Sequence, residues 1–374
     1  MASSTHNHRH LATTAAPPPT PSTQHPNPLS TSSDPSDVLS RLLHRLPPTL
    51  SLPSRRSPPP TTTTTLSPPL ISLSAQNPSS LLSASSQLGF FQLTSHSIPP
   101  HLAHSAESDS LSLFTLPREQ KHLYFPQNWP LGFDCDDDDD DNDNGTATES
   151  FCFDSTCSAE SAELSLAALG EFTREMEKVG LEVIEALSCA VGFENPLRED
   201  PTRVCSLMWV SEESAGDKPV VSGKFYPYVV GLHYQIRCQR YSLLADSGWV
   251  SVSPQIDSIL VTLGDIAQVW SNGKTKKVRG RPIPCLENNM KNTRCMSISL
   301  LVTLPLESTV SPLPNPRPNI AYGEDSRVDN EDGDTSSIDM MENRAFNSFS
   351  FEDYAWRVYH ERLPSKDPLD RYRV

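Results

Sequence analysis

The sequence contains no histidine between Tyr234 and Tyr359, although the whole chain has eleven. Seven stand at or before His101, and the others are His104, His122, His233 and His360. A mononuclear iron site of the facial type needs two imidazoles and one carboxylate on converging positions. The absence therefore excludes a site whose two imidazoles both come from residues 235–358.

Other features are also absent or scarce. No apolar run approaches the roughly 20 residues of a membrane-spanning helix, so we expect no membrane insertion. The eight cysteines contain no C-x-x-C pair and no zinc-type spacing, which indicates reduced thiols of an intracellular protein. Basic residues are few, and the formal net charge of −16 argues against nucleic acid or an anionic membrane as the main partner.

The start of the chain has the composition of a disordered leader. Its first 33 residues contain no Asp or Glu and are rich in Ser, Thr and Pro. We predict disorder over residues 1–68, because such tracts cannot build a packed core. A cytoplasmic or nuclear protein is the expectation. A chloroplast transit peptide within residues 1–33 is the alternative, although Arg9 alone supplies fixed positive charge there.

Apolar spacing predicts helices over residues 79–88, 101–114, 159–191 and 351–363. Short alternating runs predict strands at 204–210, 225–228, 230–238, 240–244, 249–252, 258–263 and 296–303. Helices followed by many short strands indicate an α+β protein with a β-sandwich or barrel core.

Composition also predicts the domain organisation. We expect an N-terminal helical region at 69–199, a β core at 200–311, a disordered insertion at 312–345, and a C-terminal helix and tail at 346–374. Residues 134–144, almost all acidic, are expected to form a solvated loop, because so many like charges cannot be buried together.

Three stretches together resemble the plant 2-oxoglutarate- and Fe(II)-dependent dioxygenases, which include gibberellin and flavonoid oxidases. Residues 88–99 (LGFFQLTSHSIP) are similar to an N-terminal family segment, and residues 350–354 (SFEDY) to the start of its C-terminal helix. The most specific match is SGWVSV at 247–252 followed by LGDIAQVWSNG at 263–273. The resemblance implies a double-stranded β-helix (jelly roll) flanked by helices, with Fe(II) and 2-oxoglutarate as cofactors.

The iron ligands that the resemblance implies are altered. The family's His-x-Asp motif aligns with Lys224, Phe225 and Tyr226, and its second histidine with Gly280. A shifted alignment offers His233, but glutamine then stands where a carboxylate is needed. We interpret His233 as a satisfied core or pocket histidine and expect no bound iron.

The family's Arg-x-Ser pair for 2-oxoglutarate is also displaced, because Arg294 precedes Ser297 by three residues instead of two. A one-residue slip turns a strand side chain to the opposite face unless a bulge restores it. Arg294 and Ser297 nevertheless remain the candidate cofactor-binding residues.

Three hypotheses follow for function. The first is a pseudo-oxygenase whose pocket, lined by Tyr226, Tyr228 and His233, holds a small organic molecule or a protein partner. The second is an active 2-oxoglutarate-dependent dioxygenase of a hormone or specialised metabolite with an unconventional metal site. The third is a scaffold that uses the leader and the acidic loop. The basic group from Lys274 to Arg281 is interpreted as a solvated turn, with anion binding as the alternative.

Overall fold

The computed structural model describes residues 65–73, 78–136, 148–154, 165–198, 200, 203–213, 225–285, 295–314, 344–361 and 366–374. All of them belong to one compact unit that spans residues 62–374. Within these ranges no helix is long and apolar enough to cross a membrane.

A mixed sheet of eight strands dominates the described residues, in the order β1-β2-β9-β6-β11-β5-β4-β3. Only the β1–β2 pair is parallel. Its strands are β1 (Leu70–Ile71), β2 (Phe90–Leu93), β3 (Gly132–Asp136), β4 (Thr148–Asp154), β5 (Cys205–Glu213), β6 (Val230–Tyr234), β9 (Ile259–Leu263) and β11 (Cys295–Thr303). Strands from the N-terminal region thus extend both edges of the core sheet.

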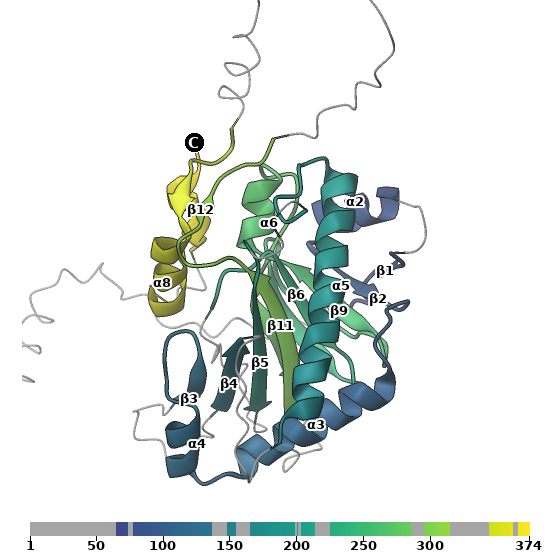
Figure 1. The fold of residues 1–374 in the computed structure, drawn as a ribbon. Helices are drawn as coiled ribbons and strands as arrows, with labels where there is room; N and C mark the ends of the chain where they lie inside the picture. The colour runs from purple at the N-terminus through teal and green to yellow at the C-terminus, as the bar shows by residue number, and fades with distance from the viewer. Residues whose placement is uncertain are drawn as a thin grey trace, which may run out of the picture. The chain divides into compact units, whose positions relative to one another are not determined.

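Helices cover one face of this sheet. They are α2 (Pro78–Gln87), α3 (Pro100–Thr115), α4 (Arg118–Tyr124) and α5 (Ala167–Val191). The long helix α5 crosses β6 and β11, and α3 packs against α5 (Figure 1). A Cβ at Gly180 would lie 2.7 Å from Val302, so this glycine permits the close approach of α5 to the sheet.

A second sheet has the order β10-β7-β8 and packs against the opposite face. Its strands are β7 (Arg240–Ala245), β8 (Gly248–Val252) and β10 (Val278–Cys285). Side chains from both sheets, including Phe90, Leu243, Leu260 and Val278, form one buried apolar cluster. Two antiparallel layers closed over a shared core confirm the predicted α+β jelly roll.

The C-terminal segments return to the core. They comprise the pair β12 (Thr309–Val310) and β13 (Phe349–Ser350), α8 (Phe351–Glu361) and the 3₁₀ helix η2 (Pro368–Tyr372), whereas the short helix α6 (Asp265–Trp270) lies between β9 and β10. The predicted C-terminal helix is confirmed, since Tyr354 and Val358 of α8 are buried. Arg362, predicted for the same face, lies outside the described residues.

Several local predictions were wrong. Residues 225–228 are not a strand, although Tyr226 and Tyr228 are buried. Asp134 and Asp136, predicted within the solvated loop, lie in strand β3, because backbone pairing with β4 holds them there. The basic turn is also different: its second half forms β10, and Lys277 is fully buried because two carboxylates pair with it.

Candidate functional site

The position that the resemblance assigns to the second iron-ligating histidine, Gly280, lies against Phe225, the middle residue of the aligned His-x-Asp motif. Gly280 has φ of 68°, in the left-handed region that favours glycine. An ideal Cβ at Gly280 would lie 2.5 Å from Cδ1 and 2.6 Å from Cε1 of Phe225. The Phe225 ring therefore fills the space into which a side chain at position 280 would project. Lys224 lies outside the described residues.

Tyr226, at the position of the family carboxylate, lies among aromatic rings. Its ring centroid is 5.9 Å from that of Trp129 and 6.1 Å from that of Phe351. Burial raises the pKa of Tyr226 far above its usual value, with smaller contributions from Cys205 and Cys152. The phenol therefore stays neutral in the range where proteins are normally active, which makes it a poor ligand for a divalent cation.

His233 is buried between the two sheets, and both of its ring nitrogens have partners. Nδ1 lies 2.7 Å from Ser299 Oγ, and Nε2 lies 3.2 Å from Thr262 Oγ1. Burial, and to a smaller extent the positive charge of Arg281, lowers the pKa of His233 to about 3. The imidazole is thus neutral and held in place by two hydroxyls, as a structural histidine would be.

Tyr228 continues this polar network to the second sheet. Its hydroxyl donates to the Val278 carbonyl at 2.7 Å and also lies 3.1 Å from Thr262 Oγ1. Burial raises the pKa of Tyr228, so the hydroxyl remains a donor. Tyr228 and His233 therefore meet through Thr262, whereas Tyr226 points toward Trp129 and α8.

A guanidinium does reach the inner face of the large sheet, but it comes from Arg281. The Nη1 atom of Arg281 donates to Ser211 Oγ at 2.6 Å, and its Cζ atom lies 4.4 Å from the Trp209 ring centroid. Ser211 on β5 is the cross-strand partner of Ser297 on β11. Arg294 lies outside the described residues, so its predicted pairing with Ser297 remains a prediction.

Sequence analysis did not predict the position of Arg281, because strand alternation would point its side chain to the face opposite that of position 280. A register shift in β10 between Arg279 and Ile283 breaks that alternation. The only sequence signal is Gly280 itself, a residue common at bulges.

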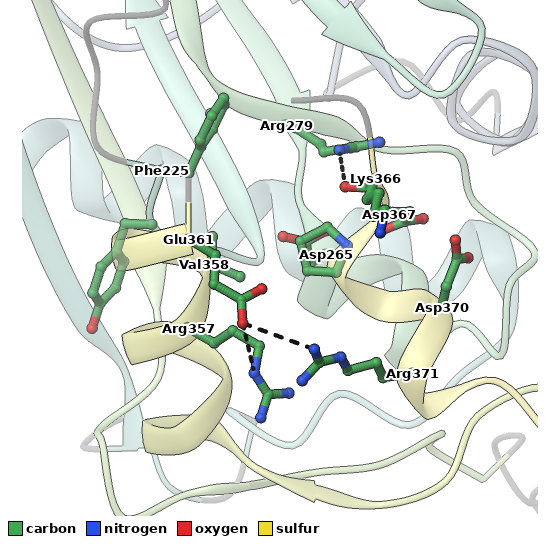
Figure 2. Close-up of a pocket in the computed structure, with 13 residues that line it drawn as sticks. Phe225, Asp265, Arg279, Arg357, Val358, Glu361, Lys366, Asp367, Asp370 and Arg371 are labelled. Carbon is green, nitrogen blue, oxygen red and sulfur yellow. Dashed lines mark hydrogen bonds and ion pairs between the residues drawn. The ribbon is translucent and has the colours of Figure 1, made fainter. Parts of the chain in front are cut away.

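A cavity of about 390 Å³ opens beside this site. One wall contains Phe225, Tyr226 and Gly280, and the other is built from α8 and the segment 366–371. Figure 2 shows Arg279 on one side of the cavity and Arg357 and Arg371 on the other. Sequence reasoning placed only Tyr226 here, because residues about 80 to 145 positions away in the chain complete the wall.

A buried lysine anchors the C-terminal segment behind the cavity. The Nζ atom of Lys277 lies 2.7 Å from Asp265 Oδ1 and 2.6 Å from Asp367 Oδ1. The Lys277 side chain is 0% exposed, and Asp265 belongs to the GD pair of the family-like motif. This ion pair joins residues 90 positions apart and fixes the distal wall against the barrel.

The described residues do not fit a mononuclear iron centre. Within the described ranges no group of three or more His, Cys, Asp or Glu side chains is placed to hold a metal ion. Of the assigned ligand positions, the two that the structure describes hold a buried neutral phenol (Tyr226) and a glycine (Gly280), and neither supplies the carboxylate or imidazole donor that Fe(II) requires.

Comparison with known proteins places the chain among oxygenases. Residues 69–161 match the family described as non-haem dioxygenase in morphine synthesis N-terminal. The chain is 23% identical to gibberellin 2-beta-dioxygenase 2 of Arabidopsis thaliana over 63% of this chain and 73% of the relative. It is also 23% identical to gibberellin 2-beta-dioxygenase 1 of Pisum sativum, over 66% of this chain and 80% of that protein.

Solved structures share the fold. JOX2, in complex with 2OG, Fe and JA, superposes with a TM-score of 0.65 at 15% identity, covering 89% of this chain and 97% of JOX2. The rice dioxygenase for auxin oxidation gives a TM-score of 0.59 at 18% identity, over 82% and 99%. The N-terminal match, the relatives and the jelly roll together support the plant 2-oxoglutarate- and Fe(II)-dependent dioxygenase family as the one that this chain resembles.

Proposed function

We propose that this protein is a pseudo-oxygenase: a member of the dioxygenase family that binds a small molecule without iron-dependent catalysis. The observation that carries the proposal is the contact between Phe225 and Gly280. A ligand set that was merely incomplete would leave space for metal and co-substrate. Here the space beside position 280 is filled by a ring, and a histidine could not enter without displacing it.

The neighbouring polar groups support the same proposal. His233, Ser299, Thr262 and Tyr228 bond to one another, and Tyr228 also bonds to a backbone carbonyl, so these four side chains have partners without a ligand. The cavity beside Phe225 remains large enough for a small organic molecule, since ligand sites begin near 300 Å³.

One observation favours the alternative, an active 2-oxoglutarate-dependent dioxygenase with an unconventional metal site. Arg281 brings a guanidinium to Ser211, whose cross-strand partner is Ser297. A carboxylate could pair with that guanidinium in place of Arg294. The relatives are all compatible with an active enzyme, so the experiment must separate the two functions.

The test is anaerobic calorimetry of the purified full chain with Mn(II), as a stand-in for Fe(II), and 2-oxoglutarate. Gibberellin 2-beta-dioxygenase 2 of Arabidopsis serves as the positive control. We expect no saturable Mn(II) binding at concentrations that saturate the control, and no Fe(II)-dependent consumption of 2-oxoglutarate. Stoichiometric binding of both would overturn the proposal. Loss of that binding in Tyr226→Phe or His233→Gln would then identify the unconventional ligand.

A further inference from the structure

The cavity beside Phe225 combines an apolar wall with a charged one. Phe225, Val358 and Pro368 contribute apolar surface, and Arg279, Arg357 and Arg371 contribute guanidinium groups (Figure 2). Sites for small organic ligands commonly have this composition, in which apolar contacts give area and a few charged groups fix orientation.

Three of the four carboxylates that line the cavity are neutralised from behind its wall. Asp265 and Asp367 both bond to the buried Lys277 at 2.7 and 2.6 Å. Asp370 accepts from Nε of Arg373 at 3.0 Å. Neither Lys277 nor Arg373 lines the cavity, and the positive charge of Arg279 also acts on Asp367.

The fourth carboxylate, Glu361, is shared by two guanidiniums. Its Oε1 atom lies 3.5 Å from Nε of Arg357 and 4.0 Å from Nη2 of Arg371. Both distances exceed those of a normal hydrogen bond. One negative charge between two positive ones leaves an excess of positive charge that faces the cavity.

The local charge balance is therefore opposite to that of the chain, whose formal net charge is −16. Among the described residues, the lining is balanced, with the basic side chains Arg279, Arg357, Lys366 and Arg371 against the acidic ones Asp265, Glu361, Asp367 and Asp370. Lys277 and Arg373 add positive charge behind the wall, where they pair with three of these acids. A focused positive field inside an acidic protein selects small anions, since the overall charge repels large ones.

We propose that this cavity binds a small organic dianion, a dicarboxylate or a phosphate monoester, through Arg371 and Arg357, with its carbon skeleton against Phe225. No residue of β11, the strand that carries Ser297, lines the cavity. This inference gives the ligand class for the small-molecule binding proposed above, and it rests on that proposed function. Binding needs no metal, because the guanidiniums supply the charge.

The experiment is calorimetry of the full chain in EDTA at matched ionic strength, with succinate and glycerol 3-phosphate as dianions and butyrate as the monoanion. We expect the dianions to bind at least about tenfold more tightly than butyrate, because the second charge gains a charge-assisted hydrogen bond. Whichever dianion binds more tightly distinguishes a dicarboxylate from a phosphate ligand.

Three variants locate the site. Arg371→Gln should weaken dianion binding by about tenfold, since Arg371 lies 4.0 Å from Glu361 and its side chain is 62% exposed, which leaves it able to bond to a ligand. Glu361→Gln should tighten it by about threefold or more, because it removes the competing carboxylate. Arg198→Gln is the matched control: it removes the same charge from an exposed pair with Glu185, near the C-terminal end of α5.

Because the two cavity variants act in opposite directions, a folding defect cannot produce the expected pattern. Absence of dianion binding, equal effects of Arg371→Gln and Arg198→Gln, or weaker binding by Glu361→Gln would overturn the inference. These outcomes leave the proposed pseudo-oxygenase untouched, because EDTA removes metal from the assay. Conversely, iron-dependent turnover would overturn the pseudo-oxygenase and leave the anion site standing.

Discussion

Replacement of Lys277 by Met should destabilise the protein strongly. Lys277 is fully buried, and its Nζ atom contacts Asp265 and Asp367 at 2.7 and 2.6 Å. Methionine has nearly the same length and flexibility, so the change removes charge and leaves little empty volume. The two carboxylates, with side chains 9% and 16% exposed, then lose their common cation.

The magnitude follows from the burial of the pair. Removal of one partner from a buried ion pair costs about 3–5 kcal/mol, because the other charge is left uncompensated. Asp367 keeps a second contact, since Arg373 Nη2 lies 3.5 Å from its Oδ2. We therefore expect the free energy of unfolding at pH 7 to fall by about 3 kcal/mol.

The loss should also depend on pH. Burial acts to raise the pKa of Asp367, but the charge and hydrogen bond of Lys277 outweigh it and hold the pKa below its usual value. Such a carboxylate stabilises the fold above its unfolded pKa, and this contribution is lost as pH falls through the lower folded pKa. Without Lys277, burial raises the pKa, so protonation relieves the variant. The difference between wild type and Lys277→Met should shrink between pH 7 and pH 4.

The assay is urea unfolding at both pH values, followed by circular dichroism. Lys178→Met is the matched control, because Lys178 makes an ion pair of 2.6 Å with Glu175 but is 66% exposed. Its loss should cost less than about 0.5 kcal/mol. The double variant Lys277→Met/Asp367→Asn should recover part of the lost stability. A destabilisation no greater than that of Lys178→Met, or one unchanged by pH, would refute the reasoning.

Three further predictions concern the inner site. Gly280→Ala should lower the free energy of unfolding by about 2–3 kcal/mol, because Ala is strained in the left-handed backbone and its Cβ overlaps with Phe225. Phe225→Ala in the same chain should restore part of this loss. A melting curve of Gly280→Ala identical to that of the wild type would argue against the contact between Phe225 and position 280. Tyr228→Phe should cost about 1–2 kcal/mol in urea unfolding, because the Val278 carbonyl loses its donor; an unchanged midpoint would argue against that bond. The pKa of His233 is about 3 in the fold and near 6.5 in the unfolded chain, so the free energy of unfolding of the wild type should fall by about 1.4 kcal/mol per pH unit below pH 6.5. His233→Gln should lack this slope between pH 6 and pH 5. Equal slopes in the two proteins would show that His233 is not the group responsible.

The sequence predicted elements whose signal is local. The apolar stripe from Phe172 to Val191 became α5, and the motif at 263–273 identified the family and hence the fold. In both cases neighbouring residues in the sequence determine the local structure, which is the core face of a helix in the first case and a strand-to-helix turn in the second.

Predictions failed where the environment comes from a distant segment. Lys277 was expected in a solvated turn, because its neighbours in the sequence are basic. Its partner Asp367 is 90 residues away, and a local sequence pattern cannot predict an ion pair between residues so far apart. Phe225 is another case, since a strand was expected there and the residue instead fills the space above a glycine 55 positions later.

Phe225 and Gly280 also bear on how the altered site can change. A histidine restored at position 280 would collide with the Phe225 ring, and a carboxylate restored at Tyr226 would be buried between Trp129 and Phe351. Either single change is unfavourable, because it buries charge or overpacks the core before any metal can compensate. Positions 225 and 280 are therefore coupled, because a side chain at position 280 needs a smaller residue at position 225. Phe225 and Tyr226 pack through their own contacts, which supports the proposal that side chains fill the space of the conventional iron centre.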